Sequence, residues 1–239
     1  MRAIGFQTPL PIADDNSLVD IDRPRPTPSG RDLLVEIKAI SVNPADVKIR
    51  ASARPEGWRV LGWDAAGIVV EAGPEATLFK PGDEVFYAGS ITRPGTYAEF
   101  HVVDERIVGR KPKTLGWAEA AALPLTAITA WETLFDRLDV KGRAVPGAAP
   151  AILIIGGAGG VGSIAIQLAR KLTDLTVIAT ASRPETKAWA TDLGAHHVVD
   201  QPAEASRRSG TGRHRAAGAA NIKCGQQAHN ALNSSRTTQ

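Results

Sequence analysis

Cysteine and long apolar runs are both scarce in this chain of 239 residues. The single cysteine, Cys224, excludes an internal disulfide and is too few for a zinc site built from cysteines. No apolar stretch approaches the roughly 20 residues that a membrane-spanning helix needs, so no membrane partner is expected. The first residues also lack the apolar run and cleavage site of a secretory signal. These absences predict a cytoplasmic protein.

Positive charge gathers at the end of the chain. The whole chain has a net charge of +3, but residues 201–239 carry six Lys or Arg against one acid, Glu204. A basic segment can bind nucleic acid, with an affinity that falls steeply with salt. This one lacks interleaved aromatic residues and any nucleic-acid-binding motif, so nucleic acid is not expected as a partner.

Residues 1–120 show the pattern of a small, irregular β domain. Leu33 to Val42 is rich in branched apolar residues, as in a half-buried strand, and Asn43 and Pro44 end it. Asn43 can cap the helix that Pro44 begins. Further strand-like stretches cover 60–73, 84–87 and 97–103, and helix formers follow at 118–123 and 126–134.

Residues 121–200 follow a different pattern after a linker-like stretch at 142–150. Ala151 to Ile155 is apolar throughout, as in a parallel strand covered on both faces. A glycine cluster and an amphipathic helix follow, then a strand at 175–179, a helix beginning at Pro184 and a third strand beginning at Val198. The alternation predicts an α/β domain containing one half of a doubly wound parallel sheet.

Residues 201–239 contain only two large aliphatic residues, Ile222 and Leu232, and no aromatic residue. Such a segment buries too little apolar surface to offset the entropy of ordering, so we expect a disordered tail. The three strands of a second half-sheet are not expected here. We therefore expect a truncated chain, and a frameshift is one hypothesis that would explain it.

The strongest motif is a glycine turn between the apolar strand and the amphipathic helix. Gly157, Gly159 and Gly162 have the spacing G-x-G-x-x-G. We assign Gly157 to the tight turn, Gly159 to the approach of a pyrophosphate and Gly162 to helix–strand packing. Gly160 and Val161 lie at the helix amino terminus, which would hold the anion. The alternative is a glycine-rich turn with no ligand.

Cofactor preference is indicated by the end of the second strand. An enzyme that prefers NAD usually places an acid there, about 20 residues after the glycines. This chain has Ser182 and Arg183, with Lys187 one helical turn later. A hydroxyl and two cations suit the 2′-phosphate of NADP(H). The alternative is that both cations are solvated surface charges.

Six further segments together resemble the medium-chain dehydrogenase/reductase superfamily, in particular its quinone oxidoreductase branch, often named "zinc-type alcohol dehydrogenase-like". They are 41–46 (SVNPAD), 61–69 (LGWDAAGIV), 81–85 (PGDEV), 96–100 (TYAEF), 121–131 (AALPLTAITAW) and 155–162 (IGGAGGVG). The resemblance covers 1–200. It implies a GroES-like catalytic domain followed by a Rossmann domain, here incomplete. It also implies NADPH-dependent reduction of quinones, or of carbon–carbon double bonds conjugated to a carbonyl. The family commonly dimerises through a Rossmann sheet edge that this chain would lack.

The resemblance also locates the site residues. Asn43 stands near the position where zinc enzymes of the superfamily carry a cysteine, and residues 62–64 (GWD) stand where they carry glycine, histidine and glutamate. We therefore predict no zinc. Asn43 and Asp46 would line the cleft, Trp63 would form an apolar wall, and Thr126 would meet the cofactor near its nicotinamide. Asn43 is alternatively only a helix cap, and Asp64 and Tyr87 either line the pocket or are buried structural residues.

Two functions remain open at this point. The first is a zinc-independent NADPH-dependent reductase of quinones or enones, which would work by holding the nicotinamide against the substrate. The second is an inactive, truncated fragment that retains part of a dinucleotide-binding fold.

Overall fold

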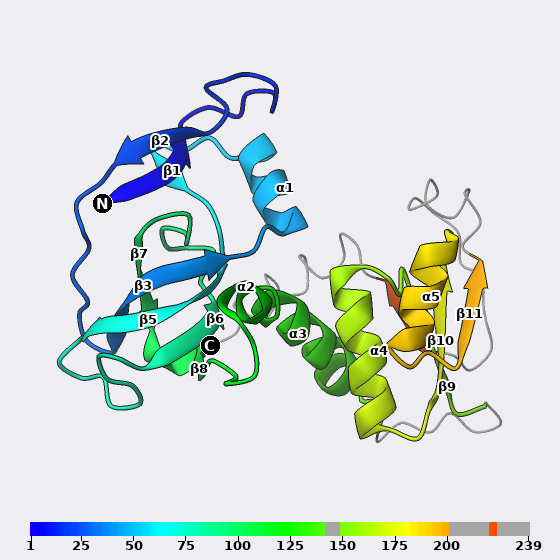
Figure 1. The fold of residues 1–239 in the computed structure, drawn as a ribbon. Helices are drawn as coiled ribbons and strands as arrows, with labels where there is room; N and C mark the ends of the chain where they lie inside the picture. Colours follow the sequence, from blue (N-terminus) through cyan, green and yellow to red (C-terminus); the bar gives the residue numbers. More distant parts are fainter. Residues whose placement is uncertain (142–148, 201–219, 224–239) are drawn as a thin grey trace, which may run out of the picture. The chain divides into compact units, whose positions relative to one another are not determined.

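A computed structural model describes residues 1–141 and 149–200, and the backbone of 220–223. The chain divides into two compact units, Met1–Leu125 and Thr126–Gln239. Figure 1 labels most of the helices and strands of both. Each unit is described by itself.

The first unit is built mainly of short strands. Its elements are β1 (Arg2–Phe6), β2 (Val19–Asp22), β3 (Asp32–Ile40), α1 (Pro44–Ser52), β4 (Arg59–Val60), β5 (Asp64–Ala72), β6 (Glu84–Ala88), β7 (Phe100–Asp104), the short 3-10 helix η1 (Glu105–Ile107), β8 (Val108–Arg110), α2 (Trp117–Ala121) and the start of α3 (Pro124–Trp131). The predicted strand before Asn43 and the predicted helix from Pro44 are both present.

Two antiparallel sheets organise this unit. One has the order β2-β1-β4 and the other β7-β3-β5-β6-β8. The central strands β3 and β5 approach so closely that a Cβ on Gly67 would lie 2.2 Å from the Glu36 carbonyl oxygen. Leu33, Val35 and Val69 from this pair are buried in the core of the larger sheet. A side chain at position 67 would therefore separate the strands that carry this core.

A buried tyrosine–histidine pair joins strands that are not neighbours in the sheet. Tyr87 on β6 and His101 on β7 stack with ring centroids 5.6 Å apart. His101 Nε2 lies 3.0 Å from the carbonyl oxygen of Pro94, which can only accept, so Nε2 carries the proton and Nδ1 accepts from the Tyr87 hydroxyl at 2.9 Å. Burial lowers the pKa of His101 to about 4 and raises that of Tyr87. The imidazole is thus held neutral inside the sheet.

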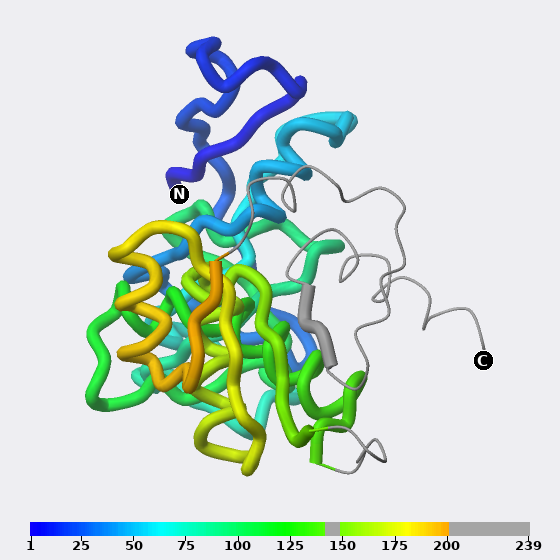
Figure 2. The backbone as a smooth tube through the Cα atoms, turned by 90° about the vertical axis from the view of Figure 1, so that its right-hand side faces the viewer, coloured from blue at the N-terminus to red at the C-terminus, as the bar shows by residue number. Residues whose placement is uncertain are grey.

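The second unit alternates strands and helices. After α3 come the π-helix η2 (Glu132–Arg137), β9 (Ala151–Ile155), α4 (Gly160–Leu172), β10 (Thr176–Ala181), α5 (Pro184–Asp192), β11 (His197–Asp200) and β12 (Ala220–Lys223). The alternation from β9 to β11 can be followed in Figure 2, from yellow-green to orange. The predicted strand, helix, strand, helix, strand order is confirmed for 151–200.

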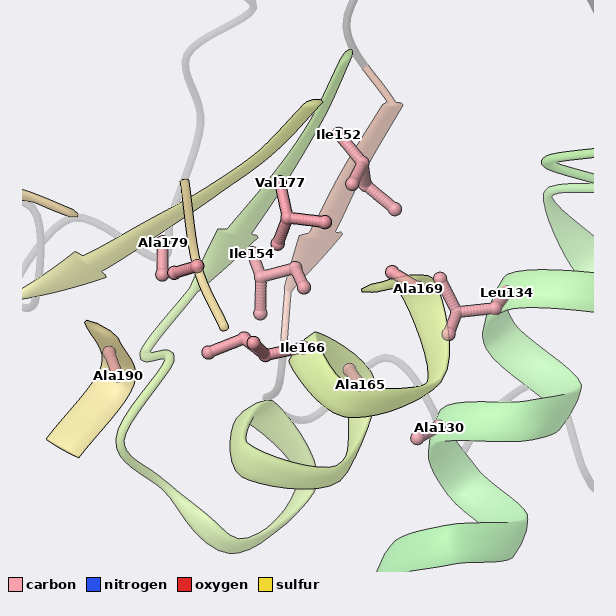
Figure 3. Packing of buried hydrophobic residues seen from close by; sticks show 11 residues of the cluster. Ala130, Leu134, Ile152, Ile154, Ala165, Ile166, Ala169, Val177, Ala179 and Ala190 are labelled. Carbon is pink, nitrogen blue, oxygen red and sulfur yellow. The ribbon is translucent and has the colours of Figure 1, made fainter. Parts of the chain in front are cut away.

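Helix α4 packs on the parallel sheet through small and aliphatic side chains (Figure 3). Ile152, Ile154 and Val177 of the strands are fully buried against it. Ala165 and Ala169 of α4 belong to the same core as Ala130 and Leu134 of α3 and η2. Alanine at these contacts lets the helix backbones approach closely.

The parallel sheet corrects one prediction. Its order is β11-β10-β9-β12, and β12 pairs in parallel with β9, so Ile222 lies opposite Ile154 in the register. The expectation of no strand after 200 is therefore wrong for Ala220–Lys223. The reason is long-range: the outer edge of β9 presents unpaired backbone groups that a later segment can satisfy. The rest of the predicted tail, 201–219 and 224–239, lies outside the described residues.

None of the helices in the described part of the chain combines the length and apolarity needed to cross a membrane.

Candidate functional site

Two buried carboxylates hold Asn43 in the first unit. Asn43 is the N-cap residue of α1, and its backbone N–H donates to Asp46 Oδ2 at 2.7 Å. The other oxygen of Asp46 accepts from the Gly62 N–H at 3.0 Å. Asp46 is 3% exposed, and burial raises its pKa, while these bonds favour the charged form. Asp46 thus connects the start of α1 to the segment before β5 through hydrogen bonds.

Asp64 holds the side chain of the same asparagine. Its Oδ2 accepts from Asn43 Nδ2 at 2.8 Å and from the Ser41 hydroxyl at 2.8 Å. Its Oδ1 accepts from the Leu125 N–H at 2.8 Å, near the start of α3. Asp64 is fully buried, which raises its pKa. One carboxylate therefore joins three segments that are far apart in the sequence.

These bonds decide what Asn43 offers to a ligand. One amide hydrogen points to Asp64, and Nδ2 also lies 3.3 Å from Ser41 Oγ. An amide has only two donor hydrogens, so in this arrangement the side chain retains acceptor capacity only, through Oδ1. The carbonyl oxygen of a ligand needs a hydrogen-bond donor. The Asn43 side chain could donate to it only if the amide group rotated away from Asp64.

Trp63 lies in an apolar core. It is 5% exposed and packs with Phe6 and Leu61. Its indole Nε1 is buried and has no hydrogen-bond partner among the described residues. The role of Trp63 as a cleft wall stays a prediction. Tyr87 lies in the core of the larger sheet of this unit, where its ring stacks on His101.

The residues around Asn43 do not fit a zinc ion. Zinc is bound by cysteine, histidine and carboxylate side chains, usually four ligands in structural sites and three in catalytic ones. Asn43 and Ser41 are not such ligands, and both Asp64 oxygens accept protein donors. Within 1–141 and 149–200, no group of three or more His, Cys, Asp or Glu is placed to hold a metal.

The glycine turn of the second unit joins β9 to α4. Gly156 has a φ of +73°, which favours glycine, and its N–H donates to Thr180 Oγ1 at 2.9 Å. The positive φ is therefore at Gly156, not at Gly157. A Cβ at Gly157 would lie 2.7 Å from the Ala179 Cβ, so packing against β10 is what requires glycine there.

The first turn of α4 has the geometry of an anion site. Helix geometry leaves the N–H groups of Gly160, Val161 and Gly162 without acceptors inside the helix. Gly159, the N-cap residue, has no side chain to shield them. Thr126 is close by, because a Cβ at Gly160 would lie 3.1 Å from Thr126 Cγ2. The structure thus brings Thr126 and the glycine turn together.

The predicted 2′-phosphate residues follow β10. Ser182 and Arg183 are exposed, and Arg183 is the N-cap residue of α5. Arg183 Nε lies 2.9 Å from Glu185 Oε1, and Lys187 Nζ lies 2.6 Å from Asp200 Oδ1. Both cations lie near the carboxyl end of the sheet, each beside an acid.

Sequence reasoning missed three residues of these sites: Ser41, Gly156 and Thr180. A signal existed for Thr180, a hydroxyl residue near the carboxyl end of a mainly apolar strand, and for Gly156, which precedes the G-x-G-x-x-G spacing. Ser41 gave no separate signal, because its partner Asp64 is 23 residues away.

Comparison with known proteins places these features in a family. Residues 29–113 match the alcohol dehydrogenase GroES-like domain. A zinc-type alcohol dehydrogenase-like protein of Staphylococcus aureus is 44% identical over 208 residues, which are 87% of this chain and 62% of the relative. A solved structure of a Rhizobium etli protein, described as zinc-dependent alcohol dehydrogenase-like by its name, is 69% identical to this chain, with a TM-score of 0.83. The match covers 86% of this chain and 61% of that one. The chain belongs to the medium-chain dehydrogenase/reductase superfamily.

A second solved structure, less similar in sequence, was determined with a bound nucleotide. The Escherichia coli quinone oxidoreductase complexed with NADPH is 27% identical, with a TM-score of 0.68, and the match covers 83% of this chain and 58% of that one. Membership in the superfamily confirms the predicted GroES-like domain followed by part of a Rossmann domain. The chain spans about 62% of the length of the curated relative that it matches.

Proposed function

We propose that this superfamily member is a zinc-independent, NADPH-dependent oxidoreductase that reduces quinones or enones. The observation that carries the proposal is the turn of residues 156–162, which places the first backbone N–H groups of α4 where they have no acceptor within the helix. Ser182, Arg183 and Lys187 follow the next strand, β10. The likeness to a quinone oxidoreductase complexed with NADPH supports the same cofactor.

Each part of the cofactor would have a defined place in the second unit. The pyrophosphate would lie at the amino terminus of α4, where backbone amides and the helix dipole favour an anion. The 2′-phosphate would take hydrogen bonds from Ser182, Arg183 and Lys187. Thr126, beside Gly160, would lie toward the nicotinamide.

The first unit would supply a positioned polar group and an apolar surface. When bound, NADPH would supply a hydride, which carries two electrons and, with one proton from water, converts a quinone to its hydroquinone or an enone to the saturated carbonyl. Asn43, held by Asp46 and Asp64, would accept a hydrogen bond from a hydroxyl of the hydroquinone product. Val42 precedes Asn43 and Val47 lies about one helical turn after it; they are 68% and 56% exposed and would suit an apolar ring.

The direct test of this proposal is NADPH binding, measured by its fluorescence at low salt. We expect binding that prefers NADPH to NADH. Arg183→Ala should weaken NADPH binding about tenfold, since a charge-assisted bond to phosphate is lost, and should leave NADH binding unchanged. Arg106→Ala is the control, because Arg106 is likewise an exposed arginine paired with an acid, Asp104. A folded chain that binds neither nucleotide would refute the proposal, and binding without turnover would leave a nucleotide-binding chain that is not a reductase.

Zinc independence is tested separately. We expect metal analysis of the purified chain to find far less than one zinc per molecule, and EDTA to leave its unfolding temperature unchanged. The reason is that the Asp64 oxygens are already taken by Ser41, Asn43 and Leu125. Stoichiometric zinc whose removal destabilises the chain would contradict this expectation.

A further inference from the structure

The cations proposed for the 2′-phosphate are both engaged by acids of the same unit. Asp200 is the last residue of β11 and lies opposite Ala181, the last residue of β10. The carboxyl ends of these parallel strands therefore bring Asp200 next to the segment that leads into α5. From α5, Lys187 reaches Asp200 at 2.6 Å. Lys187 thus already has an acidic partner within its own unit.

An acid near an adenosine ribose can play two opposite parts. It can accept hydrogen bonds from the ribose hydroxyls, as the acid that follows the second strand does in NAD-dependent enzymes. It can also compete with the 2′-phosphate for a cation and repel the phosphate charge. Asp200 ends the third strand, and its carboxylate is already bound to Lys187. This placement favours competition with the 2′-phosphate over binding of the ribose hydroxyls.

We propose that Asp200 is a specificity-determining residue, which holds Lys187 in the ligand-free chain and competes with the 2′-phosphate of NADPH for it. The proposal rests on the NADPH-dependent function above. Asp200 lowers the affinity for a 2′-phosphate without affecting nucleotides that lack one. The preference for NADPH over NADH is therefore smaller than Ser182, Arg183 and Lys187 alone would produce.

Glu185 acts in the same way on Arg183 but more weakly. The Arg183 and Glu185 side chains are 71% and 66% exposed, so water and salt screen their attraction. In the other pair the Lys187 side chain is 37% exposed and the Asp200 side chain is 73% exposed, so only the cation is partly shielded from water and salt. Glu185 also lies in the first turn of α5, where the helix dipole favours an acid.

The test uses adenosine 2′,5′-bisphosphate and 5′-AMP as probes, titrated by calorimetry into the full chain. The unmodified chain should bind the bisphosphate more tightly. Asp200→Asn should tighten bisphosphate binding about threefold to tenfold, in keeping with the worth of a partly exposed ion pair, and change 5′-AMP binding less than about twofold. Glu185→Gln should tighten bisphosphate binding by about twofold or less.

Two controls make the result specific. Glu36→Gln changes the net charge by the same amount and breaks a 2.6 Å pair with Lys38 in the other unit, so it should leave both affinities unchanged. In a Lys187→Ala background the gain from Asp200→Asn should shrink, because competition for Lys187 is then absent and only the repulsion between Asp200 and the phosphate is left to remove.

The outcomes separate the two proposals. An unmodified chain that binds both probes equally would refute the NADPH preference, and this inference with it. A chain that prefers the bisphosphate but is unaffected by Asp200→Asn would overturn the inference alone. Weaker 5′-AMP binding in Asp200→Asn would also overturn it, since Asp200 would then be a ribose acceptor.

Discussion

Gly162→Ala is expected to abolish NADPH binding and to lower the free energy of unfolding by about 3 kcal/mol, the upper range for overpacking. A Cβ at this position would lie 2.3 Å from the Gly156 carbonyl oxygen and 2.8 Å from the Gly157 Cα. Both neighbours are backbone atoms, so no side chain can move aside. Helix α4 would have to move away from β9, which would distort the turn proposed to bind the pyrophosphate.

Gly159→Ala is the matched variant for this prediction. Gly159 has a φ of −74° and ψ of 166°, which alanine adopts readily, and its Cβ would approach only the Gly156 carbonyl oxygen, at 3.3 Å. We expect a change in stability within about 1 kcal/mol but weaker NADPH binding, because the methyl group would lie where the pyrophosphate approaches. Urea unfolding and NADPH titration of both variants check the pair. Equal stability of the two variants would show that helix–strand contact does not require glycine at 162.

The second large effect is a loss of stability in mild acid that depends on His101. Its pKa is lowered from 6.5 to about 4 in the folded chain, chiefly by burial. Well above pH 6.5 the imidazole is neutral in both states and has no effect on stability. As the pH falls from 6.5 to 4, the His101 imidazole binds a proton in the unfolded chain but not in the folded chain. The free energy of unfolding should then fall by roughly 3 kcal/mol, and the loss should level off below pH 4.

Other groups also contribute to the pH dependence of stability, so the prediction is a difference between variants. Asp46 and Asp64 have raised pKa values, and protonating them as the pH falls favours the folded state. Arg93 lowers the pKa of His101 and Asp32 raises it. His101→Gln keeps these groups and removes the imidazole, so its stability should depend much less on pH between 6.5 and 4.

Urea unfolding from pH 8 to pH 4 checks the difference, with the exposed His197→Gln as a control in the other unit. An NMR titration of the His101 ring is the direct companion measurement. A ring that titrates near pH 6.5 would contradict the burial of a neutral imidazole between Tyr87 and Pro94.

Much of the fold was predictable because its signals are local. The helix from Pro44 follows from a proline at the first helical position, which has the right φ and no N–H to satisfy. The alternation of 151–200 follows from apolar strands and an amphipathic helix whose periods differ. Gly162 was assigned to helix–strand packing from its spacing alone, and the contact with residues 156 and 157 agrees with this.

The candidate site was less predictable, because its bonds join distant segments. Asn43 reads equally well as a helix cap or a ligand contact from its neighbours in the sequence. Its amide is oriented by Asp64, 21 residues away, and Asp64 also binds Leu125, 61 residues away. Which hydrogen-bonding capacity Asn43 keeps for a ligand depends on these partners.

By itself, the sequence determined the order of the two domain types, the glycine turn and the cationic segment after β10. Each depends on backbone preferences and on neighbours within a few residues. Only the tertiary structure decided that Gly156 takes the positive φ, that Ala220–Lys223 pairs with β9, and that Asp200 meets Lys187. Each of these depends on which strands lie side by side, because backbone groups at a strand edge and charged side chains pair with the groups that the completed sheet brings within reach.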